Sequence, residues 1–552
     1  MTLSRRQFGA AALGGILAPL AVPPAFAEAA RSLAAAIDAI RDYGARHLVH
    51  YRLPGMTLGL TAPGGFSTVL NFGFANREPA TAIGSDTLFQ VGSITKVMTA
   101  AVVHQLAAEG RFRLDGRISD LLPRLALPAS NGITVQDLLD HVSGLPSDAP
   151  LAPPGGLWTG FPAGAHWHYS NTGYEILGKL AEHVSGEPLA RLFEARIFNV
   201  AGMTRSRGAI IAADKALYAQ GYEAADRSVP FAFGVPLDPA AWVDVTSGAL
   251  CVASTAADMM RFLRMLSGVA AGRGGLGLSP AQGSEFGRHA VPSDTRGMTY
   301  GNGLMHVDYA GRSYLHHTGG MVSFSSSFHL DEASGAAAFA CANLSAFAEF
   351  RPRLLTLFAA EALAAAAAGR PIPAPPSLAV PLVDAASYVG GYSGPHGAFE
   401  VVPGAPLTIT ANGRSAALQP WGGELFRTTH PDFRAFTLMF ERLGPAIVGA
   451  SWGATSYARA GQSFVVPPSD PALARLAGKY VNDSPWWGTL SAVERGGALW
   501  LGTETPTSRI ADNLWRVGSQ PWSPERVDFA GLAGGRPHTL IFSGERFDRS
   551  DG

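Results

Sequence analysis

The sequence predicts an α+β domain followed by two small antiparallel β-barrels. Three observations favour this layout: strand-like segments lie on both sides of a largely helical middle, a proline-rich stretch follows at 369–382, and the tail consists of short alternating strands that repeat once. A chain of 552 residues is expected to form several domains, and its 47% apolar content is ample for packed cores.

The first 27 residues are typical of an export signal. Arg5 and Arg6 precede Phe8 and a weakly apolar run, and the small-residue stretch AFA stands before Glu28. This pattern predicts a twin-arginine signal peptide, and hence a periplasmic or secreted protein. The alternative is a membrane anchor, but the run is short and interrupted by prolines, whereas about 20 apolar residues are needed to span a bilayer. We therefore expect no stable membrane insertion.

Residues 28–368 are expected to form the α+β domain. A helical pattern over 31–50 precedes strands over 55–76, which enclose a glycine turn. A mostly helical middle with loops rich in glycine and proline follows. Strands return at YLHHTGGMVSFSSSFHLD and GAAAFACANLS, and a last helix runs from about Arg351 to Ala368. Strands from the two ends are therefore expected to share one sheet.

The tail begins with GRPIPAPPSLAVPL, residues 369–382, which predicts a proline-rich linker. Short strands such as FEVV and LTIT follow, and a second break, VVPPSDPA, precedes a similar series. SYVGGYSG is similar to RLAGKYVN, and LTIT to LWLG, which indicates a repeat of about 80 to 90 residues. We expect one barrel over 383–466 and a second over 467–552. The alternative is one continuous all-β domain.

Charge and cysteine content exclude several classes of function. The chain has 42 basic and 43 acidic residues, so nothing indicates a nucleic acid partner. Cys251 and Cys341 fit no metal-binding spacing, and the apolar runs around them favour buried free thiols over a disulfide. We expect neither a metal nor another cofactor.

A serine and a lysine three residues apart begin the helical stretch QVGSITKVMTAAVVHQLAAEG. Ser93 could simply cap this helix. Lys96, however, is one of only four lysines, and none of the others has a serine three residues before it. The spacing places both side chains on one helix face. Because a lysine whose pKa is lowered by burial can take the proton of a serine, the pair is a candidate catalytic dyad.

Tyr169 and Asn171 form a second candidate motif, in a polar loop before an amphipathic helix. Tyr-x-Asn is a weak signal by itself, because YGNG at Tyr300 and YVND at Tyr480 also match. Order along the chain and flanking residues favour Tyr169, and we interpret Tyr300 and Tyr480 as structural. A tyrosine near a lysine can relay a proton, and an asparagine can hold a substrate amide.

The third motif is His317-Thr318-Gly319, which leads into a strand and is followed by Gly320. Glycines here would let a substrate lie against the strand edge, and a backbone N–H group can help to form an oxyanion hole. Taken alone, His317 could equally be a half-buried hydrogen-bonding residue.

Together the three motifs resemble those of the penicillin-recognising serine hydrolases, which include class C β-lactamases, D,D-peptidases, D-aminopeptidases and related esterases. LLDHVSGLP, IFNVAGMTRS and STAADMMRFLRML are also similar to stretches of this family, and the likeness covers about residues 31–365. The resemblance implies a serine β-lactamase/transpeptidase-like fold for the first domain, with lipocalin-like barrels behind it.

The resemblance also implies a role for each motif. Ser93 would be acylated, while Lys96 and Tyr169 would move its proton. Asn171 would bind the substrate amide. The oxyanion hole would use the backbone N–H groups of Ser93 and Gly320, and substrate would be bound by the residues of the third motif, His317, Thr318 and Gly319.

Two features distinguish this chain from β-lactamases and D,D-peptidases. The third motif begins with His317 instead of the lysine usual there, which resembles D-aminopeptidases and many esterase-like members; an imidazole attracts a substrate carboxylate less than a fixed ammonium does. The two barrels resemble the three-domain layout of bacterial D-aminopeptidases, in which a loop of the last barrel reaches the active site. NDSPWWGTL and TETPTSRIADN are candidates for such a loop, although tryptophans are more often core residues.

The resemblance therefore implies an exported serine hydrolase with an acyl-enzyme on Ser93, and the two departures favour an aminopeptidase or peptidase on short, D-residue-containing or unusual peptides. A carboxylesterase and a weak β-lactamase are alternatives within the family. A non-catalytic penicillin- or peptide-binding protein is the alternative from another class. The expected partner is a small peptide, amide or ester, and the chain could form a homodimer.

Overall fold

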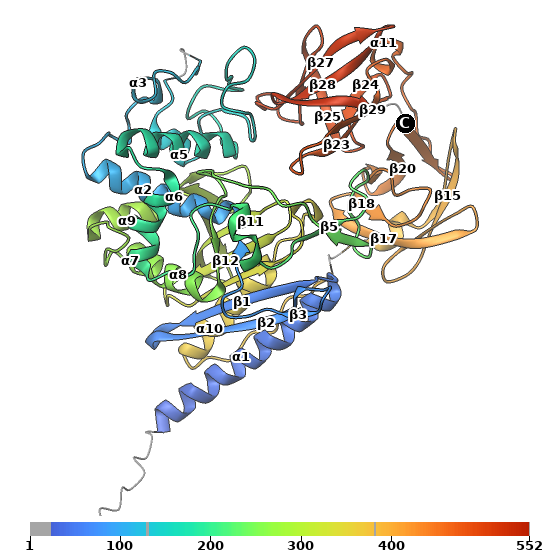
Figure 1. The fold of residues 1–552 in the computed structure, drawn as a ribbon. Coiled ribbons are helices and arrows are strands. Elements are labelled where there is room, and N and C mark those ends of the chain that lie inside the picture. The colour runs from blue at the N-terminus through green and yellow to red at the C-terminus, as the bar shows by residue number, and fades with distance from the viewer. Residues whose placement is uncertain (1–23, 129–131, 380–381, 383, 551–552) are drawn as a thin grey trace, which may run out of the picture.

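The structure is a computed structural model that describes residues 24–128, 132–379, 382 and 384–550. Most of the expected signal peptide, including Arg5 and Arg6, lies outside the described residues. Three units follow one another along the chain, an α+β domain and two closed β-barrels (Figure 1). The predicted fold class is confirmed, and a single continuous all-β tail is excluded because the tail closes twice. Within the described residues, no helix combines the length and the apolar character needed to cross a membrane.

A nine-stranded antiparallel sheet forms the centre of the α+β domain. Its strand order is β3-β2-β1-β13-β12-β11-β10-β9-β8, so strands from the two ends of the domain meet where β1 pairs with β13. The strands are β1 (Gly55–Ala62), β2 (Phe66–Asn76), β3 (Thr81–Ala82), β8 (Val291–Pro292), β9 (Met298–Gly301), β10 (Leu304–Tyr309), β11 (Arg312–Gly320), β12 (Ser325–Asp331) and β13 (Ala337–Ala342).

Helices cover both faces of this sheet. α1 (Pro24–His50) and α10 (Arg353–Ala367) pack together on one face, and α8 (Ala256–Ala270) packs on the other. The sequence of β13, AAFACA, suits a strand buried on both sides: Phe339 and Cys341 enter the core on the α8 side, and the alternating alanines enter the core on the α10 side. Both cysteines of the chain are buried and free.

The long segment between β3 and β8 is mostly helical, and its contact with the sheet carries the candidate site. Helix α2 follows the short 3₁₀ turn η2 (Gly92–Ile94) and is buried on all sides from Thr95 to Leu106. The elements of this segment are β4 (Phe89–Gln90), α2 (Thr95–Ala108), α3 (Ile118–Leu121), α4 (Val135–Leu139), α5 (Asn171–Ser185), α6 (Leu189–Phe193), α7 (Asn199–Ala201), β5 (Tyr222–Ala224), β6 (Leu237–Pro239), β7 (Ala253–Ser254) and α9 (Pro280–Arg288).

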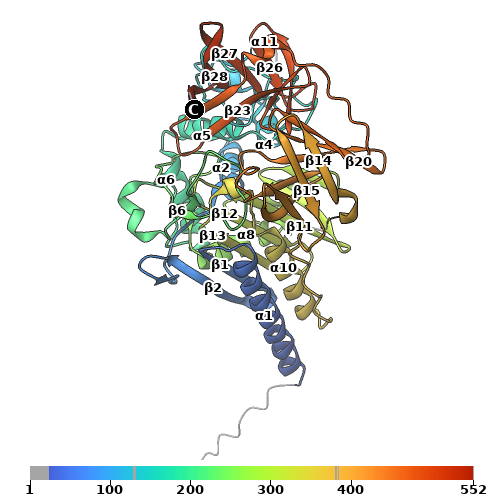
Figure 2. The same ribbon diagram turned by 90° about the vertical axis from the view of Figure 1, so that its right-hand side faces the viewer.

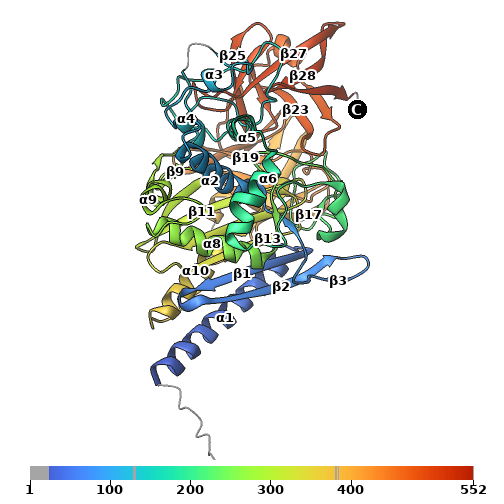
Figure 3. The same ribbon diagram turned by 60° about the vertical axis from the view of Figure 1, so that its left-hand side comes forward.

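The tail forms two barrels, β14 to β21 and β22 to β29, with α11 (Pro471–Ala474) before the second. Each contains a buried tyrosine whose hydroxyl donates to the carbonyl four residues earlier, Tyr392 to Tyr388 at 2.7 Å and Tyr480 to Leu476 at 2.8 Å. This shared contact explains why SYVGGYSG and RLAGKYVN look alike. The second barrel lies at the end of the molecule opposite α1, near α4 and α5, as Figures 2 and 3 show.

The strands of the first barrel are β14 (Gly390–Gly394), β15 (Gly397–Val402), β16 (Thr408–Ala411), β17 (Arg414–Gly422), β18 (Leu425–Thr428), β19 (Leu438–Leu443), β20 (Ala446–Trp452) and β21 (Thr455–Arg459). Those of the second barrel are β22 (Gly478–Asn482), β23 (Gly488–Arg495), β24 (Ala498–Leu501), β25 (Thr505–Ala511), β26 (Leu514–Val517), β27 (Arg526–Ala533), β28 (Arg536–Phe542) and β29 (Glu545–Ser550).

Candidate active site

Ser93 lies on the tight turn that joins β4 to α2. Gly92 before it has φ +58°, and a Cβ at Gly92 would lie 2.7 Å from the backbone nitrogen of Gly320, so the turn can approach β11 only with glycine at this position. The N-terminus of the buried helix α2 therefore meets the end of β11. Ser93 is half-buried and faces a cavity between the two.

Lys96 is completely buried beneath Ser93. Its Nζ atom lies 3.0 Å from Ser93 Oγ, 2.6 Å from Asn171 Oδ1 and 3.0 Å from the carbonyl oxygen of Ala249. Burial lowers the pKa of Lys96 to about 7, although the negative charges of Asp148 and Glu175 act in the opposite direction. A large fraction of Lys96 is therefore neutral near pH 7, and a neutral amine can accept the Ser93 proton.

Tyr169 is the third residue of this cluster and shares a hydrogen bond with Ser93. Lys96 Nζ lies 4.9 Å from the centre of its ring, and the ring of His141 packs against it at 4.3 Å. Burial raises the pKa of Tyr169 well above its usual value, and the hydrogen bond to Ser93 offsets only part of that rise. The phenol is therefore protonated at neutral pH and can donate its proton to a leaving group.

Asn171 is the first residue of α5, a helix capped by the Ser170 side chain, which accepts the N–H of Gly173. Its amide is held at both ends, because Oδ1 accepts from Lys96 and Nδ2 donates to Asp148 Oδ1 at 2.7 Å. Asn171 lines the cavity, where a substrate amide would have to share these contacts.

The third motif differs in one respect from the sequence-based expectation. Side chains alternate along β11, so Thr318 and Gly320 line the cavity, whereas His317 and Gly319 do not. His317 is buried, with Nε2 3.3 Å from Tyr300 Oη and Nδ1 2.6 Å from the Thr318 carbonyl oxygen. Burial, assisted by the charge of Lys96, lowers the pKa of His317 to about 3, and the imidazole is neutral.

The end of β11 offers an open strand edge to the cavity. β10 pairs with β11 only as far as His316, whereas β12 pairs with it up to Gly320. The backbone from His317 onward therefore has one free side, where a substrate could add as a strand. Gly319 allows the close crossing of β11 over the Ser93 turn, because a Cβ there would lie 1.9 Å from the Val91 carbonyl oxygen. The proposed oxyanion donors, the N–H groups of Ser93 and Gly320, lie at this crossing.

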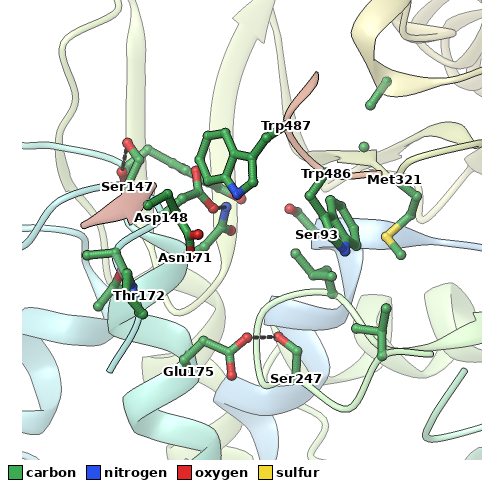
Figure 4. Close-up of a pocket in the computed structure, with 18 of the residues that line it drawn as sticks. Ser93, Ser147, Asp148, Asn171, Thr172, Glu175, Ser247, Met321, Trp486 and Trp487 are labelled. Atoms are coloured by element: carbon green, nitrogen blue, oxygen red, sulfur yellow. Dashed lines mark hydrogen bonds between the residues drawn. The ribbon is translucent and has the colours of Figure 1, made fainter. Parts of the chain in front are cut away.

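The cavity has a volume of about 850 Å³ and a mostly acidic set of charged side chains (Figure 4). Its carboxylates are Asp148, Glu175, Asp244 and Glu545. Arg351 is the cation that lines it; its Nη1 donates to the carbonyls of Phe350 and Ala346, and burial lowers its pKa to about 10.

The second barrel forms one wall of the cavity. Ser484, Trp486 and Trp487, on the loop between β22 and β23, line it together with Glu545 at the start of β29. NDSPWWGTL is thus the candidate loop that reaches the site; TETPTSRIADN contributes no residue to this cavity. The expectation that the tryptophans are core residues is correct in part, since Trp486 packs against the core of the α+β domain and Trp487 against that of its own barrel.

Sequence reasoning missed several residues of the site. Tyr300, which begins the YGNG turn and is interpreted from the sequence as structural, is fully buried and does not line the cavity; its hydroxyl lies 3.3 Å from His317 Nε2. The glycine that ends this turn, Gly303, packs directly on the backbone of Lys96. Asp148, Glu175 and Arg351 belong to no short motif, and only the tertiary structure brings them to Ser93.

The fold and this site define a serine hydrolase of the Ser-x-x-Lys type. The model of the family described as Beta-lactamase matches residues 33–362, more than half of the chain, and the chain belongs to this family. The resemblance to penicillin-recognising serine hydrolases is thereby confirmed.

Sequence relatives have several activities. A β-lactamase of Lysobacter lactamgenus is 27% identical over 265 residues, which cover 46% of this chain and 64% of the relative. Esterase EstB of Burkholderia gladioli is 29% identical over 219 residues, which cover 33% of this chain and 53% of the relative. The chain thus spans about half to two thirds of the length of these curated relatives.

Solved structures share the fold. The octameric penicillin-binding protein homologue from Pyrococcus abyssi matches with a TM-score of 0.55 and 20% identity, over 77% of this chain and all of that one. The D-amino acid amidase from Ochrobactrum anthropi SV3, complexed with D-phenylalanine, matches with a TM-score of 0.51 and 23% identity, over 60% of this chain and 98% of that one.

Proposed function

We propose that this chain is an exported serine hydrolase that forms an acyl-enzyme on Ser93 and cleaves short peptides or amides with a free amino end, including those with a D-residue or another unusual residue on the acyl side. The observation that supports the chemistry is the buried Lys96 amine, 3.0 Å from Ser93 Oγ and with a pKa of about 7. The carboxylates that line the cavity support a substrate with a free, positively charged amino end.

The residues support a complete proton path. Neutral Lys96 takes the proton of Ser93 as Oγ bonds to the substrate carbonyl carbon, and the N–H groups of Ser93 and Gly320 stabilise the oxyanion. As the C–N bond breaks, Tyr169 gives its proton to the leaving amine and is reprotonated by Lys96. Water then attacks the ester, losing its proton to the same pair, and the returning proton restores Ser93.

The charges around the cavity support a cationic substrate end. Four carboxylates and one cation, Arg351, line the cavity, and the Arg351 guanidinium already donates to two carbonyls. Asp148 lines the cavity next to Asn171. The surrounding protein removes water from its carboxylate and so raises its pKa; the hydrogen bond from Asn171 opposes this rise and the nearby Glu525 adds to it. A substrate ammonium would compensate this concentration of negative charge. A carboxylate on the substrate would add to it.

The wall formed by the second barrel supports a short substrate. Trp486 and Trp487 close one side of the cavity, and about 850 Å³ accommodates a small ligand of a few residues. A long cell-wall strand would have to displace this loop.

The test uses kcat/KM of the mature protein, residues 28–552, for D-alanine p-nitroanilide, p-nitrophenyl acetate and nitrocefin. The matched control is N-acetyl-D-alanine p-nitroanilide, which has the same amide but no ammonium. We expect the free-amine anilide to be cleaved at least about tenfold faster than its acetylated form, the effect of one lost charge pair in a partly buried site. Nitrocefin as the best substrate by an order of magnitude would identify a β-lactamase instead, and p-nitrophenyl acetate as the best would favour an esterase.

The Ser93→Ala variant tests whether this chain is an enzyme or a non-catalytic binding protein. The variant should lose hydrolysis and covalent labelling by a fluorophosphonate probe, because no other group can carry the acyl chain. A wild-type chain that neither hydrolyses any of these substrates nor forms an adduct detectable by mass would contradict the proposal and favour a non-catalytic reader of peptides.

Export is proposed from the sequence of residues 1–27. Changing Arg5 and Arg6 to lysine should leave the precursor in the cytoplasm, because paired arginines are the determinant of the twin-arginine route. Fractionation with an antibody against the mature chain measures this. A normal periplasmic yield of the double variant would point to the general secretory route.

A further inference from the structure

The second barrel also contacts the α+β domain at residues 147–171, called here the catalytic loop because they include Tyr169 and Asn171; the barrel residues of this contact do not themselves line the substrate cavity. The loop between β26 and β27 packs against residues 158–168, the segment that precedes Tyr169. The ring of Trp522 stacks on His166 at 4.4 Å with an interplanar angle of 8°, and Trp158 Nε1 donates to the Pro524 carbonyl at 2.8 Å. The Arg526 guanidinium lies 3.5 Å above the Trp158 ring.

Glu525 is the one acidic side chain of this contact that reaches the catalytic loop in the described residues. Its Oε1 accepts the backbone N–H of Ser147 at 2.6 Å and lies 2.9 Å from His168 Nε2. Its Oε2 accepts from the Ser543 hydroxyl at 2.5 Å, which fixes the carboxylate to its own barrel. Burial raises the pKa of Glu525, but the hydrogen bonds from His168, Ser543 and Ser147 outweigh it, and the net shift is downward.

Ser147 carries this contact to the catalytic groups. Its carbonyl accepts the backbone N–H groups of Asn171, at 2.7 Å, and of Thr172, at 3.1 Å. Its hydroxyl donates to the Tyr169 carbonyl at 3.1 Å. Ser147 is therefore hydrogen-bonded to the backbone of both residues of the Tyr-x-Asn motif, and the next residue along the chain holds the Asn171 amide.

We propose that Glu525 is a positioning residue: by accepting hydrogen bonds from Ser147 and His168, it fixes Tyr169 and Asn171 relative to Ser93 and Lys96. The second barrel then completes the catalytic geometry in addition to closing the cavity. Glu525 itself does not line the cavity. The inference rests on the proposed acyl-enzyme chemistry at Ser93 and is independent of the substrate class.

The experiment measures the second-order rate of Ser93 labelling by a small fluorophosphonate on the full mature chain, followed by intact mass. This probe needs the activated serine but no free amine. Three variants of Glu525 are compared, with glutamine, alanine and aspartate. Glu494→Ala is the matched control. Glu494 is also a carboxylate of the second barrel that accepts backbone N–H groups, from Asp470 and Gly497, but these donors and the Ser469 hydroxyl belong to the second barrel itself.

Glu525→Ala should lower the labelling rate and kcat by about 10- to 100-fold, the cost of displacing catalytic groups by around an ångström, with a smaller change in KM. Glu525→Gln should stay within about threefold of the wild type, because its amide oxygen can accept both contacts. Glu494→Ala should label at the wild-type rate.

A labelling rate for Glu525→Ala within about twofold of the wild type would overturn the proposal, as would equal losses in the alanine and glutamine variants. If circular dichroism shows that the alanine variant does not fold, Glu525→Asp is used instead. Its side chain is one methylene shorter, so its carboxylate cannot reach Ser147 and His168 in the same way. Labelling of the aspartate variant at the wild-type rate would overturn the proposal. Ser93→Ala is run in parallel; labelling that persists in it would disprove the proposed function and not the role of Glu525.

Discussion

The two barrels have the same architecture but make different contacts with the α+β domain. The loop between the first two strands is only residues 395–396 in the first barrel, but residues 483–487, DSPWW, in the second. The first barrel contributes no residue to the cavity at Ser93, whereas the second contributes four and also holds the Tyr169 loop through Glu525. A repeated fold thus acquires a role at the active site through one longer loop and one half-buried carboxylate.

The first barrel is attached elsewhere. The Gln419 side-chain amide exchanges two hydrogen bonds with the backbone of Phe233, both at 2.8 Å, and Arg427 pairs with Glu349 at 2.8 Å. These contacts fix the barrel to the α+β domain. The comparison predicts that changes in the second barrel at the cavity loop or at Glu525 alter catalysis, and that changes in the first barrel alter stability alone.

The largest effect on catalysis should come from the Ser93–Lys96 dyad, which lies in the α+β domain. Lys96→Arg should lower kcat/KM by about 10³-fold or more, because arginine stays charged and cannot accept the Ser93 proton. Lys179→Arg is the matched control, since Lys179 is exposed and pairs only with Glu182. Steady-state kinetics measure both. An active Lys96→Arg variant would show that another group is the base.

The loop of the second barrel should give the next largest effect. Changing Trp486 and Trp487 together to alanine removes one wall of the cavity, so kcat/KM for a short aminoacyl anilide should fall by about tenfold while longer peptides gain relative to it. His396→Ala, in the corresponding loop of the first barrel, is the control and should change neither rate. If the two variants behave alike, the barrels do not differ in the way proposed.

How far the sequence predicted this arrangement depends on the range of the contacts. The sequence predicts the Ser93–Lys96 pair because its spacing is local, less than one helical turn. It predicts the barrels because strand alternation and the repeated tyrosine are local patterns as well. Asp148 and Asn171, 23 residues apart, and Ser147 and Glu525, 378 residues apart, meet only through the tertiary fold.

The direction of side chains along β11 was the other feature that could not be predicted from the sequence. In the third motif, HHTGG contains no regular alternation of polar and apolar residues, so the phase of β11 could not be read from it. The structure turns Thr318 toward the cavity and His317 toward Tyr300. Of the residues predicted at the end of this strand, Thr318 and Gly320 line the cavity, whereas His317 and Gly319 do not.

The pH dependence of catalysis should separate the dyad from its surroundings. The neutral form of Lys96 is the base, so kcat/KM for N-acetyl-D-alanine p-nitroanilide, which has no amine to titrate, should rise with pH through about 7 and then level off. The protonated Tyr169 should cause no fall below about pH 10. Glu175 favours the charged form of Lys96, so Glu175→Gln should move this rise to lower pH and increase the rate several-fold at about pH 6. A rise that stays at the same pH would show that Lys96 does not govern it. Arg261→Gln, at a residue that does not line the cavity, is a control for nonspecific effects.

The smallest effect on catalysis should come from the first barrel. The Arg427 side chain is 9% exposed; it pairs with Glu349, donates to the Phe231 carbonyl at 3.3 Å and stacks on Trp421 at 4.1 Å. Arg427→Ala removes these contacts and leaves a buried carbonyl without a donor, so the free energy of unfolding in urea should fall by about 1–3 kcal/mol. Arg414→Ala is the control, because Arg414 is 64% exposed and lies 3.8 Å from Asp432, a pair that contributes little.

Since no residue of the first barrel reaches Ser93, kcat/KM of the folded Arg427→Ala variant should equal that of the wild type. A loss of rate at unchanged fold would mean that the first barrel, too, transmits its position to the active site.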